Sequence, residues 1–95
     1  MRDYELVLVI SPQVADEGVP AIVERVTQFI TGRGGSVTEV NNWGRRKLAY
    51  PIKHFTEGNY VLTRVKLEAK TTAELEACLQ ISEDILRHLL VKVGE

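Results

Sequence analysis

The chain has 95 residues, 44% hydrophobic and 26% charged, which suits one globular domain, residues 1–95, with no room for a second core. Its formal net charge of −1 argues against a general nucleic-acid binder, because such proteins are usually basic overall. Any affinity for phosphate must therefore come from a local cluster of cations. A single cysteine, Cys78, excludes an internal disulfide, and no apolar stretch is long enough to span a membrane. We therefore expect a soluble protein of a reducing, intracellular compartment.

Residues 4–10 predict a strand, because aliphatic and β-branched residues follow one another until Pro12. From Leu6 onward both faces are apolar, which is typical of a central strand. A helix is expected to begin between Asp16 and Pro20, where an N-cap candidate, an acidic first turn and an early proline occur together. Glycines at positions 32, 34 and 35 end this helix, whose buried face repeats at helical spacing: Ile22, Val23, Val26, Phe29 and Ile30.

Residues 36–53 predict a long, irregular strand with a bend near Gly44. Pro51 cannot donate a ladder hydrogen bond, so this strand is expected at a sheet edge. Residues 54–58, ending in Gly58, predict a short hairpin connection. The next strand, residues 59–67, alternates in polarity, and its core face is predicted to carry Val61, Thr63, Val65 and Leu67.

Thr71 to Glu74 match the capping-box pattern, so a second helix is expected to start there. Its buried stripe is predicted to consist of Leu75, Cys78 and Leu79, which makes Cys78 an inert core thiol. Residues 85–93 form the last extended run, in which the facing of His88 stays open. Strand, helix, strand, strand, helix, strand is the order of an α+β, ferredoxin-like split βαβ domain.

That fold has a four-stranded antiparallel sheet with both helices on one face, and right-handed crossovers place the first and third strands in the centre. The other face is left open. It should carry an aliphatic patch bordered by cations, which is more apolar surface than a monomer ordinarily exposes. We therefore expect a protein partner on this face and on the edge strand, contacting Val7, Val9, Tyr50, Tyr60 and Leu62.

Catalysis is not expected, because no converging set of titratable groups can be assembled. His54 lies in the hairpin connection and His88 in the last strand, with no serine or cysteine that the fold places beside either. Cysteine and histidine spacing typical of a metal site does not occur. We predict no catalytic residues, no metal and no cofactor.

Residues 43–53, Trp-Gly-Arg-Arg-Lys-Leu-Ala-Tyr-Pro-Ile-Lys, combine cations, aromatics and turn residues as no other stretch does. Surface cations often stay in water, and that interpretation stays open for each one. As a group they can form a discontinuous basic surface that contacts phosphates and recognises RNA shape: Arg2, Arg45, Arg46, Lys47, Lys53, Arg64, Arg87 and Lys92.

The same run resembles the signature of the family of the sixth protein of the bacterial small ribosomal subunit. The opening residues 2–5, the strand around Tyr60 and the closing run 85–92 are also similar to that family. The resemblance implies a ferredoxin-like, non-catalytic protein of the cytoplasm. It also implies binding to the central domain of small-subunit ribosomal RNA together with the eighteenth small-subunit protein, and a monomer when free.

A different class of function stays open beside this one, because the ferredoxin-like fold serves many unrelated activities. The alternative is a homo-oligomeric domain that self-associates through the open sheet and binds a small ligand or acts as a small isomerase.

Overall fold

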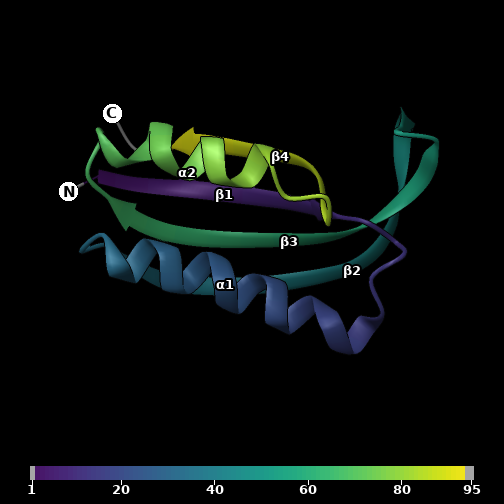
Figure 1. Cartoon of the computed structure of the whole chain (residues 1–95), viewed down its shortest axis with the longest axis horizontal. Helices are drawn as coiled ribbons and strands as arrows, with labels where there is room; N and C mark the ends of the chain where they lie inside the picture. The colour runs from purple at the N-terminus through teal and green to yellow at the C-terminus, as the bar shows by residue number, and fades with distance from the viewer. Residues whose placement is uncertain (1, 94–95) are drawn as a thin grey trace.

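The computed structural model describes residues 2–93. Its elements follow the predicted order: β1 (Arg2–Ile10), a 3-10 helix η1 (Asp16–Gly18), α1 (Val19–Gly32), β2 (Ser36–Ile52), β3 (Phe55–Leu67), α2 (Thr71–Gln80) and β4 (Ile85–Lys92). The strands form one antiparallel sheet in the order β2-β3-β1-β4 (Figure 1). The ferredoxin-like topology, the central β1 and the edge position of β2 are therefore confirmed.

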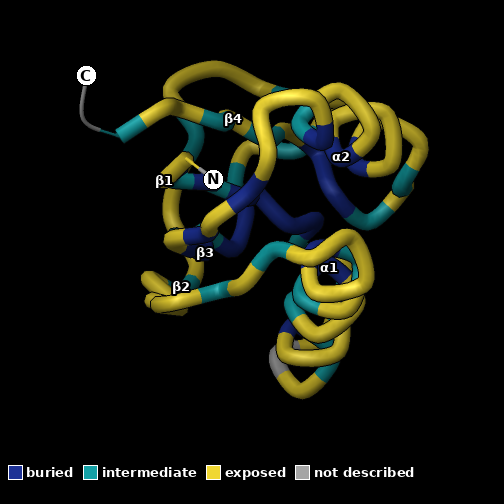
Figure 2. Tube along the Cα trace, turned by 90° about the vertical axis from the view of Figure 1, so that its left-hand side faces the viewer, coloured by how far each residue is buried: buried dark blue, intermediate teal, exposed yellow. Residues whose placement is uncertain are grey.

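Both helices pack against the same face of the sheet, and the buried residues lie between the two layers (Figure 2). Leu6, Leu8 and Ile10 of β1 point into this core, as do Val61 and the other predicted core residues of β3. His88 stands opposite Leu8 in the β1–β4 register, so it belongs to the helix side of the sheet and is half-buried. The question that the sequence left open for His88 is thereby answered.

The two helix starts differ in detail from the predicted caps. α1 begins after Gly18, without a side-chain cap within the described residues, and the acids expected in its first turn belong to η1. α2 begins at Thr71 as predicted, but Lys70 is its N-cap, and the threonine and glutamate do not form a capping box. The Thr72 hydroxyl instead donates to the Ala69 carbonyl at 2.8 Å. Backbone turns preceding both helices replace the expected side-chain caps.

The prediction that Cys78 is buried is wrong. Leu75 and Leu79 are 1% and 2% exposed, whereas Cys78 is exposed on the same helix. The buried residues of α2 are spaced four apart along the helix and form a narrow stripe. Cys78 follows Leu75 by three positions and therefore lies beside this stripe, at the solvent edge.

The predicted position of the hairpin connection is also wrong. The turn consists of Lys53 and His54, with φ of 50° and 71°, and Ile52 pairs directly with Phe55. Two successive positive φ values give the turn the twist that suits a tight hairpin. Gly58, expected in the connection, is buried inside β3, where an added Cβ would lie 2.7 Å from Val9 Cγ1.

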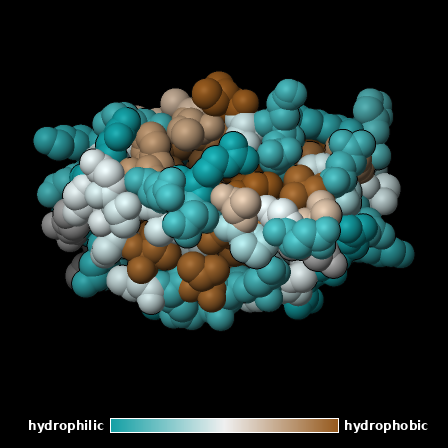
Figure 3. Space-filling view, turned by 60° about the horizontal axis from the view of Figure 1, so that its bottom comes forward, coloured by the Kyte–Doolittle hydropathy of each residue, from teal (hydrophilic) through white to brown (hydrophobic). Residues whose placement is uncertain are grey.

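On the α1 and β2 side, hydrophobic side chains reach the surface in separate patches among hydrophilic ones (Figure 3). A groove of about 440 Å³ runs between these two elements, and Val23, Val37 and Val40 are among the residues that line it. At the C-terminal end of α1, Gly34 has φ of 83°, which confirms that glycine ends this helix.

Gly35 leaves no room for a side chain, because an added Cβ would overlap the Lys66 carbonyl and lie 2.9 Å from Ile30 Cγ2. We expect Gly35→Ala to lower the free energy of unfolding by about 1–3 kcal/mol, the usual cost of overpacking. Gly32→Ala is the control, since an added Cβ there meets nothing within 4 Å among the described residues. Urea denaturation should show a lower midpoint for the first variant; equal midpoints would contradict the packing.

Candidate nucleic-acid interface

The distal part of the β2–β3 hairpin, residues 45–58, is set at an angle to the sheet by an irregularity at Gly44. The β2–β3 register shifts between Asn42 and Gly44, and Gly44 has φ of 79°. The Asn42 side-chain oxygen accepts a hydrogen bond from the Gly44 N–H at 2.8 Å, which closes a local turn. The bend predicted near Gly44 is therefore confirmed, and Figure 1 shows the hairpin curving up at the end of the sheet.

The hairpin reaches over one end of the open face of the sheet. Arg87 Nη1 donates a hydrogen bond of 2.6 Å to the Tyr50 hydroxyl, although β4 and β2 occupy opposite edges. Arg87 stands opposite Val9 in the register, on the side away from the helices. Val9 is only 5% exposed there, since it packs over Gly58 of the hairpin. One end of the open face is thus covered by the chain itself.

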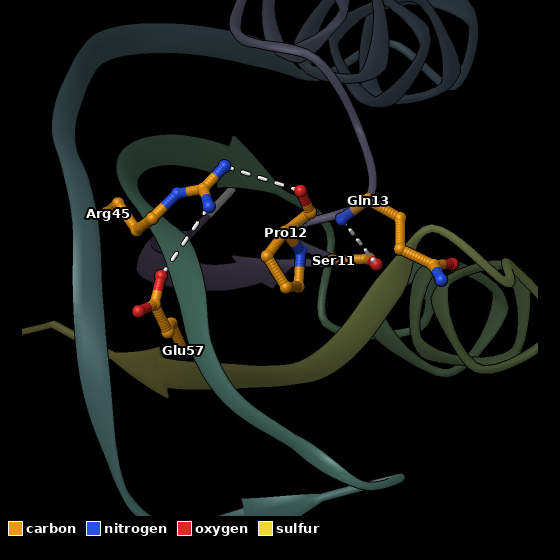
Figure 4. A network of polar contacts seen from close by, with 5 residues as sticks. All are labelled: Ser11, Pro12, Gln13, Arg45 and Glu57. Atoms are coloured by element: carbon orange, nitrogen blue, oxygen red, sulfur yellow. Dashed lines mark hydrogen bonds and ion pairs between the residues drawn. The ribbon is translucent and has the colours of Figure 1, made fainter.

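Arg45 joins the hairpin to the loop after β1 (Figure 4). Its Nη2 donates to the Pro12 carbonyl at 3.3 Å, and its Nη1 lies 3.5 Å from Glu57 Oε1 on the paired strand. Ser11 beside it accepts a hydrogen bond from the Gln13 N–H at 3.2 Å, which shapes the loop. Both terminal nitrogens of the Arg45 guanidinium therefore have protein partners, and these contacts hold the hairpin against the loop after β1.

The neighbouring cations are more available to a ligand. The Arg46 guanidinium lies 5.7 Å from the centre of the Trp43 ring, a cation–π arrangement that holds it in place while leaving it exposed. Lys47 and Lys53 are also exposed. Together with Arg87 these residues give the hairpin end of the molecule a concentrated positive charge.

The remaining predicted RNA contacts lie elsewhere. Arg64 is on the open face and forms an ion pair of 3.1 Å with Glu5. Arg2 and Lys92 are exposed at the opposite end of the sheet. Lys92 pairs with Tyr4, and Arg2 precedes Tyr4 by two residues, so both belong to the helix side of the sheet, as Tyr4 does. The eight cations therefore fall into a hairpin group and a distant group.

The predicted partner residues do gather on the open face. Val7, Tyr60 and Leu62 are half-buried, and Tyr50 is 56% exposed on the hairpin, while Val9 offers little surface. The sequence reasoning missed Leu89 and Val91 of β4, which share this face and are exposed. Their alternation with His88 and Leu90 was the available signal, but the facing of that strand could not be fixed.

Charge divides unevenly between the layers. The four strands and the Lys53–His54 turn hold nine cations and four acids. The helices, η1 and the other described loops hold three cations and eight acids. Of those three cations, Arg25 and Arg33 form ion pairs with Asp84 and Glu74. The sheet layer is therefore the side that attracts phosphate, despite a net charge of −1.

Within residues 2–93, no group of three or more His, Cys, Asp or Glu side chains could hold a metal ion. No helix in that part of the chain is long and apolar enough to span a membrane.

Comparison with known proteins identifies the family. The model of the family described as Ribosomal protein S6 matches residues 3–92. The small ribosomal subunit protein bS6 of Moorella thermoacetica is 43% identical over 95 residues, 100% of this chain and 97% of that protein. Its counterpart from Dehalococcoides mccartyi is 41% identical over 95 residues, 100% of this chain and 87% of that protein.

The crystal structure of 30S ribosomal protein S6 from Thermotoga maritima has a TM-score of 0.89 and 34% identity, covering 96% of this chain and 86% of that one. Fold and relatives together define a structural protein of the small ribosomal subunit, located in the cytoplasm within the ribosome, and not an enzyme. The chain belongs to the ribosomal protein S6 family, as the resemblance of residues 43–53 predicted.

The Tyr50–Arg87 contact generates a prediction about hairpin order. Tyr50→Phe removes the acceptor, so the amides of residues 46–57 should exchange with deuterium about fivefold faster, the effect of about 1 kcal/mol of local stability. The β1–β3 amides should keep their protection. Tyr60→Phe is the control, because it removes a phenol hydroxyl from the body of β3. Unchanged exchange in the hairpin would show that this contact does not hold it.

Proposed function

We propose that the chain binds the central domain of small-subunit ribosomal RNA through the hairpin cations and the adjoining open sheet face, jointly with the eighteenth small-subunit protein. The observation that carries this proposal is the division of charge: the sheet layer is basic and the helix layer acidic. Since RNA presents a dense row of phosphates, the basic layer faces it and the acidic layer faces away.

Within the hairpin the cations have different roles. Arg46 and Lys47 contact phosphate, because they are exposed and Arg46 is held over Trp43 without losing its donors. Arg45 fixes the hairpin against the β1 loop. Lys53 is exposed in the tight turn at the hairpin tip, where it is open to the RNA. Shape and backbone recognition suit this arrangement better than base stacking, since the open face offers Tyr60 without a second aromatic beside it on β1.

The apolar part of the open face suits the protein partner. Tyr60 and Leu62 of β3 and Leu89 and Val91 of β4 lie on either side of β1, and the last two are 50% and 45% exposed. A partner seated here would bury these side chains and, if it is basic, extend the positive surface offered to RNA. The chain alone is a monomer in this proposal, because its affinity is for a different protein.

RNA binding by the hairpin is tested by Arg46→Ala with Lys47→Ala. Losing two phosphate contacts should reduce RNA affinity and make the slope of log K against log salt concentration less steep by roughly 1.4–1.8. The melting temperature should change little, because exposed cations contribute little to stability. Arg33→Ala with Lys70→Ala is the matched control, since it removes one arginine and one lysine from the helix layer. Equal losses for both double variants, measured by filter binding across a salt series, would refute the assignment.

Joint binding is tested by titrating RNA with the chain in the presence and absence of the eighteenth small-subunit protein. Affinity should be weak for the chain alone and at least tenfold higher with the partner. Leu89→Ser should remove most of that gain, because it exposes a hydroxyl where the partner packs. Equal RNA affinity with and without the partner, or a stable homodimer of the free chain in sedimentation, would contradict the proposal.

A further inference from the structure

The helix layer contains a groove that the RNA proposal does not use. It lies between α1 and α2, beside the loop that leads to β4, and has a volume of about 440 Å³. Its walls are largely apolar, with Ile22, Val26 and Phe29 from α1 and Leu75 and Leu79 from α2. A cleft of this size and lining has room for a few aliphatic side chains of a ligand.

The rim of the groove carries an apolar residue that the fold does not need. Ile81 directly follows α2 and is 82% exposed, more than Trp43, Leu89 or the other large hydrophobics at the surface of the described chain. Cys78 also lines the groove and is exposed. An isoleucine on the rim of an apolar groove extends the contact surface that the groove offers to a partner.

The electrostatic environment of the groove is negative. Glu83 and Asp84 lie on its rim, and Arg25 is the cation that lines it, already paired with Asp84 at 3.4 Å. α2 ends at the groove with no basic residue in its last turn, so its C-terminal carbonyls add uncompensated negative potential. An occupant with positive charge beside its apolar residues would complement both features.

We propose that the α1–α2 groove docks a basic, amphipathic helical segment of another protein. Leucine-like side chains of the segment enter the groove and cover Ile81, while its lysine or arginine residues face Glu83, Asp84 and the end of α2. RNA is a poor occupant because the rim and the helix layer repel phosphate. A second copy of the chain would bring acidic rim against acidic rim. This surface lies on the opposite side of the sheet from the RNA surface and does not depend on it.

The single cysteine makes the proposal directly testable. The probe is a synthetic amphipathic helix of leucine and lysine, about 14 residues or four turns long. Alkylation of Cys78 by iodoacetamide reports on the groove alone, since the chain has one cysteine. Saturating leucine–lysine peptide should slow alkylation at least fivefold, and added salt should weaken the protection. A leucine–glutamate peptide of equal hydrophobicity should give no protection.

Matched variants locate the site. Ile81→Ser should weaken peptide binding roughly tenfold, equivalent to about 1.4 kcal/mol, whereas Val40→Ser, in the groove between α1 and β2, should leave it unchanged. Glu83→Lys should weaken binding, and Glu39→Lys in the sheet layer should not. All four residues are exposed, so the variants should remain folded by circular dichroism.

Three results would overturn the proposal. Equal protection of Cys78 by the leucine–glutamate peptide would show that charge does not select the occupant. Protection that rises with chain concentration and without peptide would identify a second copy instead. Absence of protection by the leucine–lysine peptide, with both helices intact, would show that the groove does not dock such a segment.

Discussion

Strand β1 pairs with β3 along one side and with β4 along the other, and the rest of the structure depends on this central position. Its alternate residues lie in two environments: Leu6 and Leu8 pack beneath the helices, while Val7 and Val9 face the open side. Because both crossovers place their helices on one face, no helix covers the other. The hairpin supplies partial cover at one end through the Tyr50–Arg87 contact, and apolar surface is left along the remainder.

The resulting asymmetry connects fold to function. A chain with net charge −1 can approach RNA because its cations and acids are sorted into different layers by the strand and helix sequences. Strand and hairpin positions hold most of the cations, and the helices together with the loops beside them hold most of the acids. In the proposed function this sorting directs phosphate to the hairpin, and it also leaves an acidic rim around the apolar groove between α1 and α2, suited to a basic protein segment. Two surfaces of opposite charge can thus serve two kinds of partner.

Hydrophobic periodicity and the positions of glycine and proline were enough to predict the element order, the edge position of β2 and the two faces of β3, because these features follow from local sequence patterns. The turn at Lys53 and His54 could not be predicted, since two successive non-glycine residues rarely adopt positive φ and the nearby Gly58 was the stronger signal. Exposure of Cys78 depends on how narrowly α2 contacts the core. The engagement of Arg45 with Pro12 depends on a loop brought close only by tertiary folding. Such long-range contacts leave no periodic trace in the sequence.

Amine footprinting would test most directly which layer meets the RNA. Lys47 and Lys53 lie in the hairpin, Lys70 lies in the helix layer, and all three are exposed. Their acylation rates should be compared in the free protein and in the complex with ribosomal RNA and the eighteenth small-subunit protein. We predict strong protection of Lys47 and Lys53 with Lys70 as reactive as in the free protein. Protection of Lys70 with Lys47 and Lys53 still reactive would contradict an RNA surface on the sheet layer.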